Sequence, residues 1–406
     1  MSASGHRAAS VAPLFDSSRL SLARRLAGVR KNELATEIGK SAAAIGAWEL
    51  GNKRPTSDSI AALSLALGVE PSFFLGGIPS NMRSGSAPHF RSLRSTSQSA
   101  RDQAEAYAEI VSDTCWAFER HVEFPEVDVP VIPVGMNSSD EEPKLAANTI
   151  RDAWGLGLDP IKHAIRTLEN HGVLIVFGPI EGARTIDAYS VNNKLRPIVV
   201  LNPSKHDYYR QRFDVVHELG HLVMHIDSEP GSRIVESQAH RFAAEFLMPA
   251  QVFSDLLPCS IDSGGWKVLK ELKETWGVSV QALLMRARDL GTINDGAYRN
   301  ATIMLNKWGW RRSEPGAVTI LEQPSLLPSA VEQLIEAGMD ERFLCGNGRI
   351  PLNIFRQMVS RIPNSSFIDS DDTQEGTVVS LFGGETDSYM VPNRGNDFKG
   401  GEKSGQ

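Results

Sequence analysis

The sequence predicts a multidomain α+β protein in which a small all-α domain precedes a larger, mainly helical domain with a small β-sheet. The chain has 406 residues, more than one hydrophobic core usually organises. Its front has the pattern of short amphipathic helices broken by glycines, whereas its middle adds short apolar runs suited to strands. We expect these divisions: 15–75, the all-α domain; 76–99, a polar linker; 100–310, the mixed domain; 311–362, a helical region; and 363–406, a disordered tail.

Apolar periodicity predicts the elements of the mixed domain. A helix over 100–120 places six apolar side chains on one face: Ala104, Tyr107, Ile110, Val111, Cys115 and Phe118. Strands are expected at 173–177 and 198–201. Further helical segments are expected at 145–154, 160–171, 208–225, 234–247, 265–290, 329–337 and 351–360.

Composition and cysteine usage indicate a cytoplasmic protein without a membrane partner. The chain is 41% hydrophobic and 22% charged, with no run of eighteen apolar residues and no secretory signal at its N-terminus. Cys115, Cys259 and Cys345 lie far apart without a Cys-x-x-Cys pair, as expected for thiols in a reducing compartment.

Charge is distributed unevenly along the chain. The first hundred residues hold 12 Lys and Arg against 6 Asp and Glu, a net charge of +6. The remainder holds 30 against 43, a net charge of -13. Because the first hundred residues are basic and the remainder is acidic, we expect only the N-terminal part to bind a polyanion.

The segment from Asp214 to His225, DVVHELGHLVMH, predicts a metal site on a helix. His217 and His221 lie four residues apart, so a helix presents both imidazoles on one face to a single zinc ion. Glu218 follows the first histidine and is placed to accept a proton from a water molecule activated by the metal. This pattern of two histidines and a glutamate indicates peptide hydrolysis. Manganese is the alternative to zinc as the bound ion.

A catalytic zinc also needs a third protein ligand. Glu236 opens a second amphipathic helix fifteen residues after His221, a gap long enough to turn the chain back against the first helix. The apolar stripe of this second helix consists of Ala239, Phe242, Ala243, Phe246 and Leu247. Glu245, about two and a half turns further along, is the rival ligand.

Two more histidines belong to the same region. His225 continues the row of His217 and His221, and we expect it to orient a ligand or to pack at the helix end. His240 lies one turn after Glu236. It is expected either to hydrogen-bond a ligand or an oxyanion at the metal site or to lie on the helix surface.

This region resembles the ImmA/IrrE metallo-endopeptidases. The likeness covers about residues 100 to 310 and is carried by these segments: Asp187–Ser190, Pro197–Asn202, Arg212–Phe213, the HELGHLVMH run, Glu236, and Phe242–Pro249. It implies a zincin-like metallopeptidase domain with His217, His221 and Glu236 as zinc ligands and Glu218 as the catalytic carboxylate. His240 stands where the family usually has asparagine.

The segment Asn32–Pro55 resembles the XRE, or Cro/CI-like, helix-turn-helix family. Its residues support a two-helix unit, since Gly39 can end the first helix and Ser41 can cap the second. The residues expected to pack these helices together are Leu34, Ala35, Ile38, Ile45 and Trp48.

The resemblance implies that the second helix enters the major groove of DNA with its first turn. The candidate DNA-binding residues are Lys40, Ser41, Ala42, Ala43, Lys53 and Arg54. Their helix is rich in alanine and carries few groups that hydrogen-bond base edges, which predicts recognition mainly through phosphates and DNA shape. The alternative is a module that has lost DNA binding and serves protein interaction or dimerisation; in the second case the chain would form a homodimer.

Two functions are compatible with these features. The first is a regulatory endopeptidase that binds DNA through residues 15–75 and cleaves a repressor or a toxin–antitoxin partner. The second is a non-proteolytic transcription regulator whose metal domain senses a ligand or a metal. The segment 197–202 is expected to bind an extended peptide by β-addition at the edge of the sheet.

Overall fold

A computed structural model describes residues 3–76, 89–90, 97–178, 188–202, 207–225, 232–311, 313–316, 318 and 320–362. These residues all belong to one unit, Met1–Ser365. The predicted disordered tail, 363–406, lies outside the described residues, as does most of the predicted linker. Within the described ranges, no helix has the length and apolarity needed to cross a membrane.

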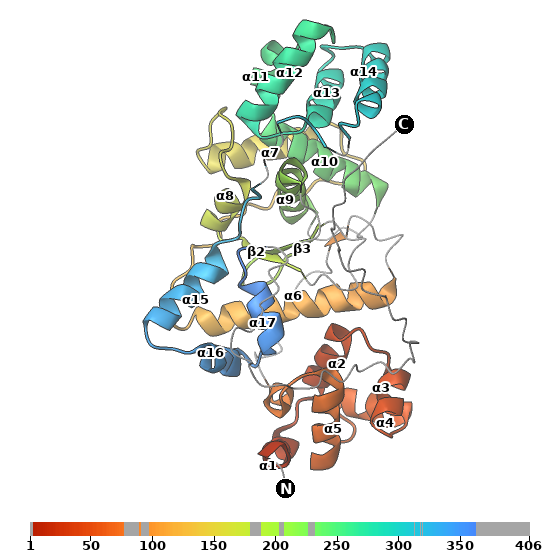
Figure 1. Ribbon diagram of the computed structural model, residues 1–406, viewed down its shortest axis with the longest axis vertical. Helices are drawn as coiled ribbons and strands as arrows, with labels where there is room; N and C mark the ends of the chain where they lie inside the picture. The colour runs from red at the N-terminus through yellow and green to blue at the C-terminus, as the bar shows by residue number, and fades with distance from the viewer. Residues whose placement is uncertain are drawn as a thin grey trace, which may run out of the picture. The chain divides into compact units, whose positions relative to one another are not determined.

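The N-terminal domain is a bundle of short helices (Figure 1). Its elements are α1 (Ala3–Val11), η1 (Ala12–Leu14), α2 (Ser17–Leu26), α3 (Lys31–Glu37), α4 (Ala42–Glu49), α5 (Ser57–Leu67) and η2 (Pro71–Phe74). The predicted turn is confirmed, because Gly39 has a φ of 64° and the Ser41 hydroxyl accepts a hydrogen bond from Ala44 N at 3.2 Å. The α1 helix was not predicted.

A four-stranded sheet forms the centre of the mixed domain. Its strands, β1 (His89–Phe90), β2 (Leu174–Phe177), β3 (Ala188–Val191) and β4 (Ile198–Leu201), follow the order β1-β3-β4-β2. The β2–β4 pair is parallel, and the other two pairs are antiparallel. The prediction that residues 197–202 form a peptide-binding edge is wrong, because β4 is hydrogen-bonded to β3 on one side and to β2 on the other.

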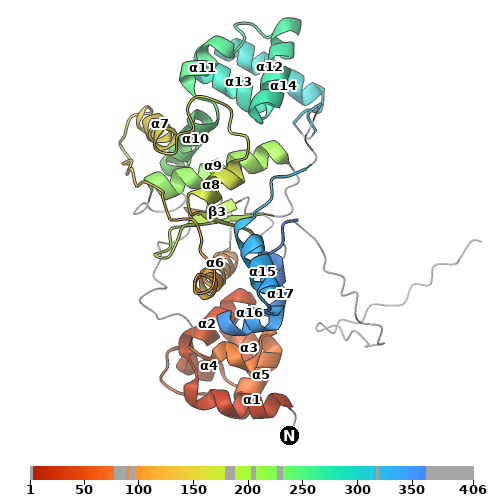
Figure 2. The same cartoon turned by 90° about the vertical axis from the view of Figure 1, so that its left-hand side faces the viewer.

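Alternate side chains of the sheet enter two different hydrophobic cores, as the period of two in a strand requires. One face contributes Leu174, Val176, Tyr189, Val191, Ile198 and Val200 to the core around α6 (Gln98–Phe118). The other contributes Ile175, Phe177, Ala188, Val199 and Leu201 to the core around α9 (Tyr208–Met224). Figure 2 shows the sheet between these two helices.

The α6 helix packs against both the sheet and the N-terminal domain. Its predicted apolar face is confirmed, since all six of its members are buried. Tyr107 donates a hydrogen bond to Phe177 O at 2.6 Å, and Tyr189 of β3 donates one to Ala104 O at 2.9 Å. On the other side, the buried Arg19 of α2 donates to Asp113 Oδ2 at 2.5 Å. The core around α6 therefore includes residues of the helix-turn-helix.

The helices around α9 form the remainder of the mixed domain. They are α7 (Glu142–Ala153), α8 (Ala164–Asn170), α10 (Arg233–Leu247), α11 (Ala250–Leu256), α12 (Ser263–Trp276), α13 (Val280–Asp289) and α14 (Asp295–Lys307). The stretch predicted at 265–290 is divided into α12 and α13, because Gly277 adopts a left-handed conformation with φ of 62°.

Three helices follow: α15 (Leu326–Glu336), α16 (Glu341–Gly348) and α17 (Leu352–Met358). The first and third match the predictions at 329–337 and 351–360. The second was not predicted, nor was α14.

Candidate metal centre

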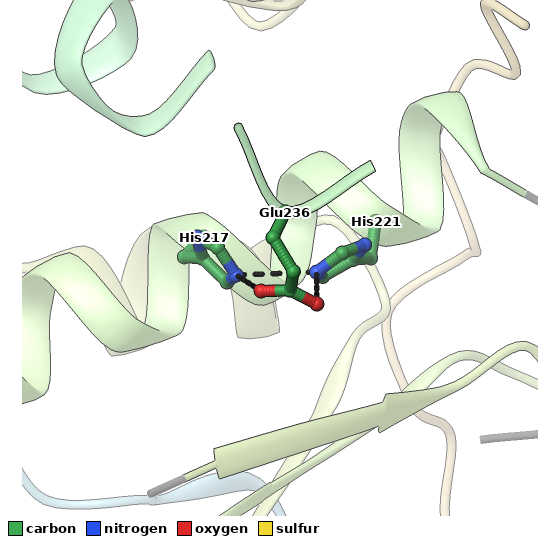
Figure 3. Close-up of side chains that lie close together, drawn as sticks. All are labelled: His217, His221 and Glu236. Atoms are coloured by element: carbon green, nitrogen blue, oxygen red, sulfur yellow. Dashed lines mark hydrogen bonds and ion pairs between the residues drawn. The ribbon is translucent and has the colours of Figure 1, made fainter. Parts of the chain in front are cut away.

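His217, His221 and Glu236 converge on one point between α9 and α10 (Figure 3). The two Nε2 atoms of the histidines are 3.1 Å apart. Glu236 Oε2 lies 3.2 Å from His217 Nε2, and its Oε1 lies 3.6 Å from His221 Nε2. The structure thus brings together the three residues that the sequence suggested as ligands.

The donor set fits a zinc ion. A tetrahedral zinc with bonds of about 2.0–2.1 Å separates its ligand atoms by about 3.3 Å. The three separations in the cluster, 3.1 to 3.6 Å, lie around that value. Both imidazoles are buried, whereas the Glu236 side chain keeps 18% of its surface exposed. The cluster is therefore partly open to solvent on the Glu236 side.

Close packing of the two helices allows Glu236 to reach the histidines. Gly220 of α9 faces Phe242 of α10, and a Cβ atom at Gly220 would lie only 3.0 Å from the Phe242 ring. Glycine therefore permits a helix separation that any larger residue would increase. The predicted apolar stripe of α10 is buried and completes this interface.

Glu218 is buried beside the cluster and is held by the sheet. The Ser190 hydroxyl of β3 donates a hydrogen bond to Glu218 Oε2 at 2.7 Å. Ser190 itself is fully buried, and its neighbour Tyr189 faces α6. The strand thus fixes one oxygen of the carboxylate that stands next to the first histidine.

A chain of hydrogen bonds leads from His221 to the backbone. Gln238 Nε2 donates to Gly135 O at 2.8 Å, so its Oε1 is the atom that faces His225 Nε2 at 3.0 Å. Because an amide oxygen only accepts, His225 carries its proton on Nε2, and in its neutral form accepts at Nδ1. His225 Nδ1 lies 3.0 Å from His221 Nδ1, which is then the donor. This tautomer leaves the lone pair of His221 Nε2 directed at the cluster.

The other two predicted neighbours occupy different positions. The His240 ring lies 5.0 Å from the His217 ring and 5.1 Å from that of Phe213, so it packs beside the first histidine. Glu245, the rival ligand, forms a buried ion pair with Arg286 and accepts a hydrogen bond from Ala250 N at 3.0 Å. Its carboxylate stabilises the start of α11 and is not part of the cluster.

The candidate DNA-binding residues lie on the surface of the N-terminal domain. All six are exposed: Lys40, Ser41, Ala42, Ala43, Lys53 and Arg54. Arg54 also donates a hydrogen bond to Pro13 O at 2.9 Å. At Gly46, in the middle of α4, an added Cβ would have no heavy atom within 4 Å, so this part of the helix surface is open.

Ser190 and Gln238 were not selected from the sequence as functional residues. Ser190 is a polar side chain inside an apolar strand, which was the signal available for it, whereas Gln238 is surrounded by polar residues and offered only its position before the apolar stripe. Ser190 lies in a strand whose four residues are all buried, and Gln238 directly precedes the buried stripe of α10. Asp187, which contributed to the family resemblance, lies outside the described residues.

Comparison with protein families agrees with this architecture. Residues 20–74 match the family model of a helix-turn-helix, and residues 168–288 match that of the IrrE N-terminal-like domain, a peptidase family. No curated protein matches the chain. The architecture is thus a domain similar to the helix-turn-helix family followed by a domain similar to the IrrE N-terminal-like peptidase family, as the resemblance implied.

Proposed function

We propose that this protein is a zinc-dependent regulatory endopeptidase whose N-terminal domain binds DNA. The observation that carries the proposal is the convergence of two imidazoles and one carboxylate beside the buried Glu218. A purely structural zinc would not require an acid next to its first ligand. The peptidase-family match over 168–288 supports the same interpretation.

In this mechanism His217, His221 and Glu236 would hold the ion. When bound, zinc supplies Lewis acidity that polarises a peptide carbonyl and lowers the pKa of water. Glu218 accepts the proton of the attacking water and then delivers it to the leaving amine. Ser190 keeps the Glu218 carboxylate oriented through the hydrogen bond to its Oε2 atom.

The substrate that we propose is a regulatory protein, either a repressor or an antitoxin partner. This part rests on the family resemblance and on the helix-turn-helix that the chain carries. Phosphate contacts from Lys40, Lys53 and Arg54 would hold the protein on DNA, with the first turn of α4 facing the major groove.

The test compares three forms of the full chain. Glu218→Gln should keep one zinc per chain and lose hydrolysis of a co-expressed neighbouring regulator, because it removes the proton acceptor but no ligand. Glu236→Ala should weaken zinc binding by more than the roughly 10–100-fold that loss of a residue hydrogen-bonded to a ligand costs, because Glu236 is proposed as a ligand itself. Zinc content by mass spectrometry and substrate cleavage on gels provide the two measurements. If Glu218→Gln cleaves the substrate like the wild type, the role of Glu218 in hydrolysis is wrong. If no form cleaves the substrate and Glu218→Gln regulates like the wild type, the ligand-sensing alternative gains support.

A further inference from the structure

The outer edge of β3 is paired with a segment that lies between the two domains in the sequence. The sheet order β1-β3-β4-β2 makes β3 the neighbour of the short strand β1. The pairing is antiparallel, with His89 opposite Ser190 and Phe90 opposite Tyr189. The small strand drawn beside β3 in Figure 1 belongs to the stretch that joins the helix-turn-helix to α6.

This edge lies next to the candidate catalytic carboxylate. Ser190, the residue opposite His89, donates its hydroxyl proton to Glu218 Oε2 at 2.7 Å. Neighbouring strands are about 4.8 Å apart, so the β1 backbone is one strand spacing from the residue that touches Glu218. The β4 strand offers no comparable edge, since both of its sides are paired.

Backbone groups at a strand edge pair with one partner at a time. An extended peptide that binds beside a sheet does so through these N–H and C=O groups. A segment of the same chain competes at an effective concentration of about millimolar, well above that of most partner proteins. Within the described residues, β1 pairs with the two central residues of β3, Tyr189 and Ser190.

We infer that β1 is a built-in competitor for the peptide substrate, and that β1 must leave the β3 edge before an extended substrate pairs there. The inference rests on the proposed endopeptidase function. It joins the two domains mechanistically, because the competing strand lies in the stretch between α5 and α6.

The test removes the backbone donors of β1. The double variant His89→Pro/Phe90→Pro has no N–H at either position, whereas the matched control His89→Ala/Phe90→Ala keeps both. A second variant replaces residues 86–93 by an alternating Gly-Ser segment of equal length, in case the prolines disturb folding. Zinc content and thermal melting show whether each protein is intact.

Two measurements follow on the full chain. A fluorescein-labelled peptide with the sequence of residues 84–95 is titrated into each protein in a Glu218→Gln background, which should prevent its cleavage. We expect at least tenfold tighter binding to the proline and Gly-Ser variants than to the wild type and the alanine control. When Glu218 is left unchanged, the same two variants should hydrolyse dye-labelled casein several-fold faster than the wild type and the alanine control.

The outcomes separate the two proposals. Equal peptide affinity in all four proteins, with equal casein hydrolysis, overturns the competition. Tighter peptide binding by the proline and Gly-Ser variants, with no casein hydrolysis by any protein, supports the competition and counts against the endopeptidase.

Discussion

The close approach of α9 and α10 predicts that Gly220→Ala weakens the metal centre. The new Cβ would lie 3.0 Å from Phe242 Cδ1 and 3.2 Å from its Cγ. Phe242 is fully buried, and its ring stacks on Phe246 with 5.8 Å between ring centres. Since that ring has no open space to enter, the strain is expected to push the two helices apart.

The magnitude follows from two opposing effects. Alanine inside a helix is favoured over glycine by about 1 kcal/mol, whereas overpacking a core costs about 1–3 kcal/mol. Gly46→Ala in α4 is the matched control, because a Cβ there meets no heavy atom within 4 Å. The free energy of unfolding of Gly220→Ala should therefore be about 1–3 kcal/mol below that of Gly46→Ala.

Urea denaturation and zinc competition with a chelating dye measure the two consequences. Because α10 carries Glu236, a wider helix separation moves one ligand away from the histidines, and zinc affinity should fall about tenfold, equivalent to about 1.4 kcal/mol. Gly46→Ala should bind zinc like the wild type. Equal stability and equal zinc affinity of Gly220→Ala and Gly46→Ala would show that α9 and α10 tolerate the added Cβ without moving apart.

Two further predictions concern the DNA-binding surface and the thiols. Lys40→Ala/Lys53→Ala should weaken binding to DNA duplexes of any sequence by the same factor, as measured by fluorescence anisotropy. The slope of log binding constant against log salt concentration should fall by about 1 for each phosphate that the variant no longer binds. Unequal effects between sequences would contradict a phosphate role. Ellman's reagent at pH 8 should modify the exposed Cys259 quickly and leave Cys115 and Cys345 protected, since burial raises the pKa of both thiols, that of Cys345 to about 12. Intact mass spectrometry counts the modified residues, and a second fast thiol would refute the burial argument.

The cluster of His217, His221 and Glu236 could be predicted because its signals are local. His217 and His221 share a helical face by spacing alone, and the apolar stripe around Phe242 shows that α10 packs on a neighbour with Glu236 in its first turn. The HELGH run and the stripe therefore specify most of the site. Gly220 was part of that run, but its proximity to Phe242 depends on the distance between two helices, which no spacing reveals.

Strand order could not be predicted from the sequence. The β4 run is apolar at every position, which is typical of a central strand as much as of a covered edge. The strands that pair with one another are not all consecutive in the sequence, and the pairing of β1 with β3 joins residues about a hundred positions apart. Register of this kind is set by tertiary packing, so the polar Ser190 gave no sign that it would touch Glu218.

The buried side chain of Arg19 bears on where the molecule can be divided. Its guanidinium donates to three acceptors, of which Phe73 O lies in the helix-turn-helix but Asp113 Oδ2 and Arg349 O lie beyond it. Truncation after about residue 80 would remove two of the three and expose to water the surface of α2 that packs on α6. An excised helix-turn-helix would thus lose apolar burial on which its own core depends. The segment that matches the helix-turn-helix family lacks Asp113 and Arg349, so DNA affinity is best measured on the whole chain.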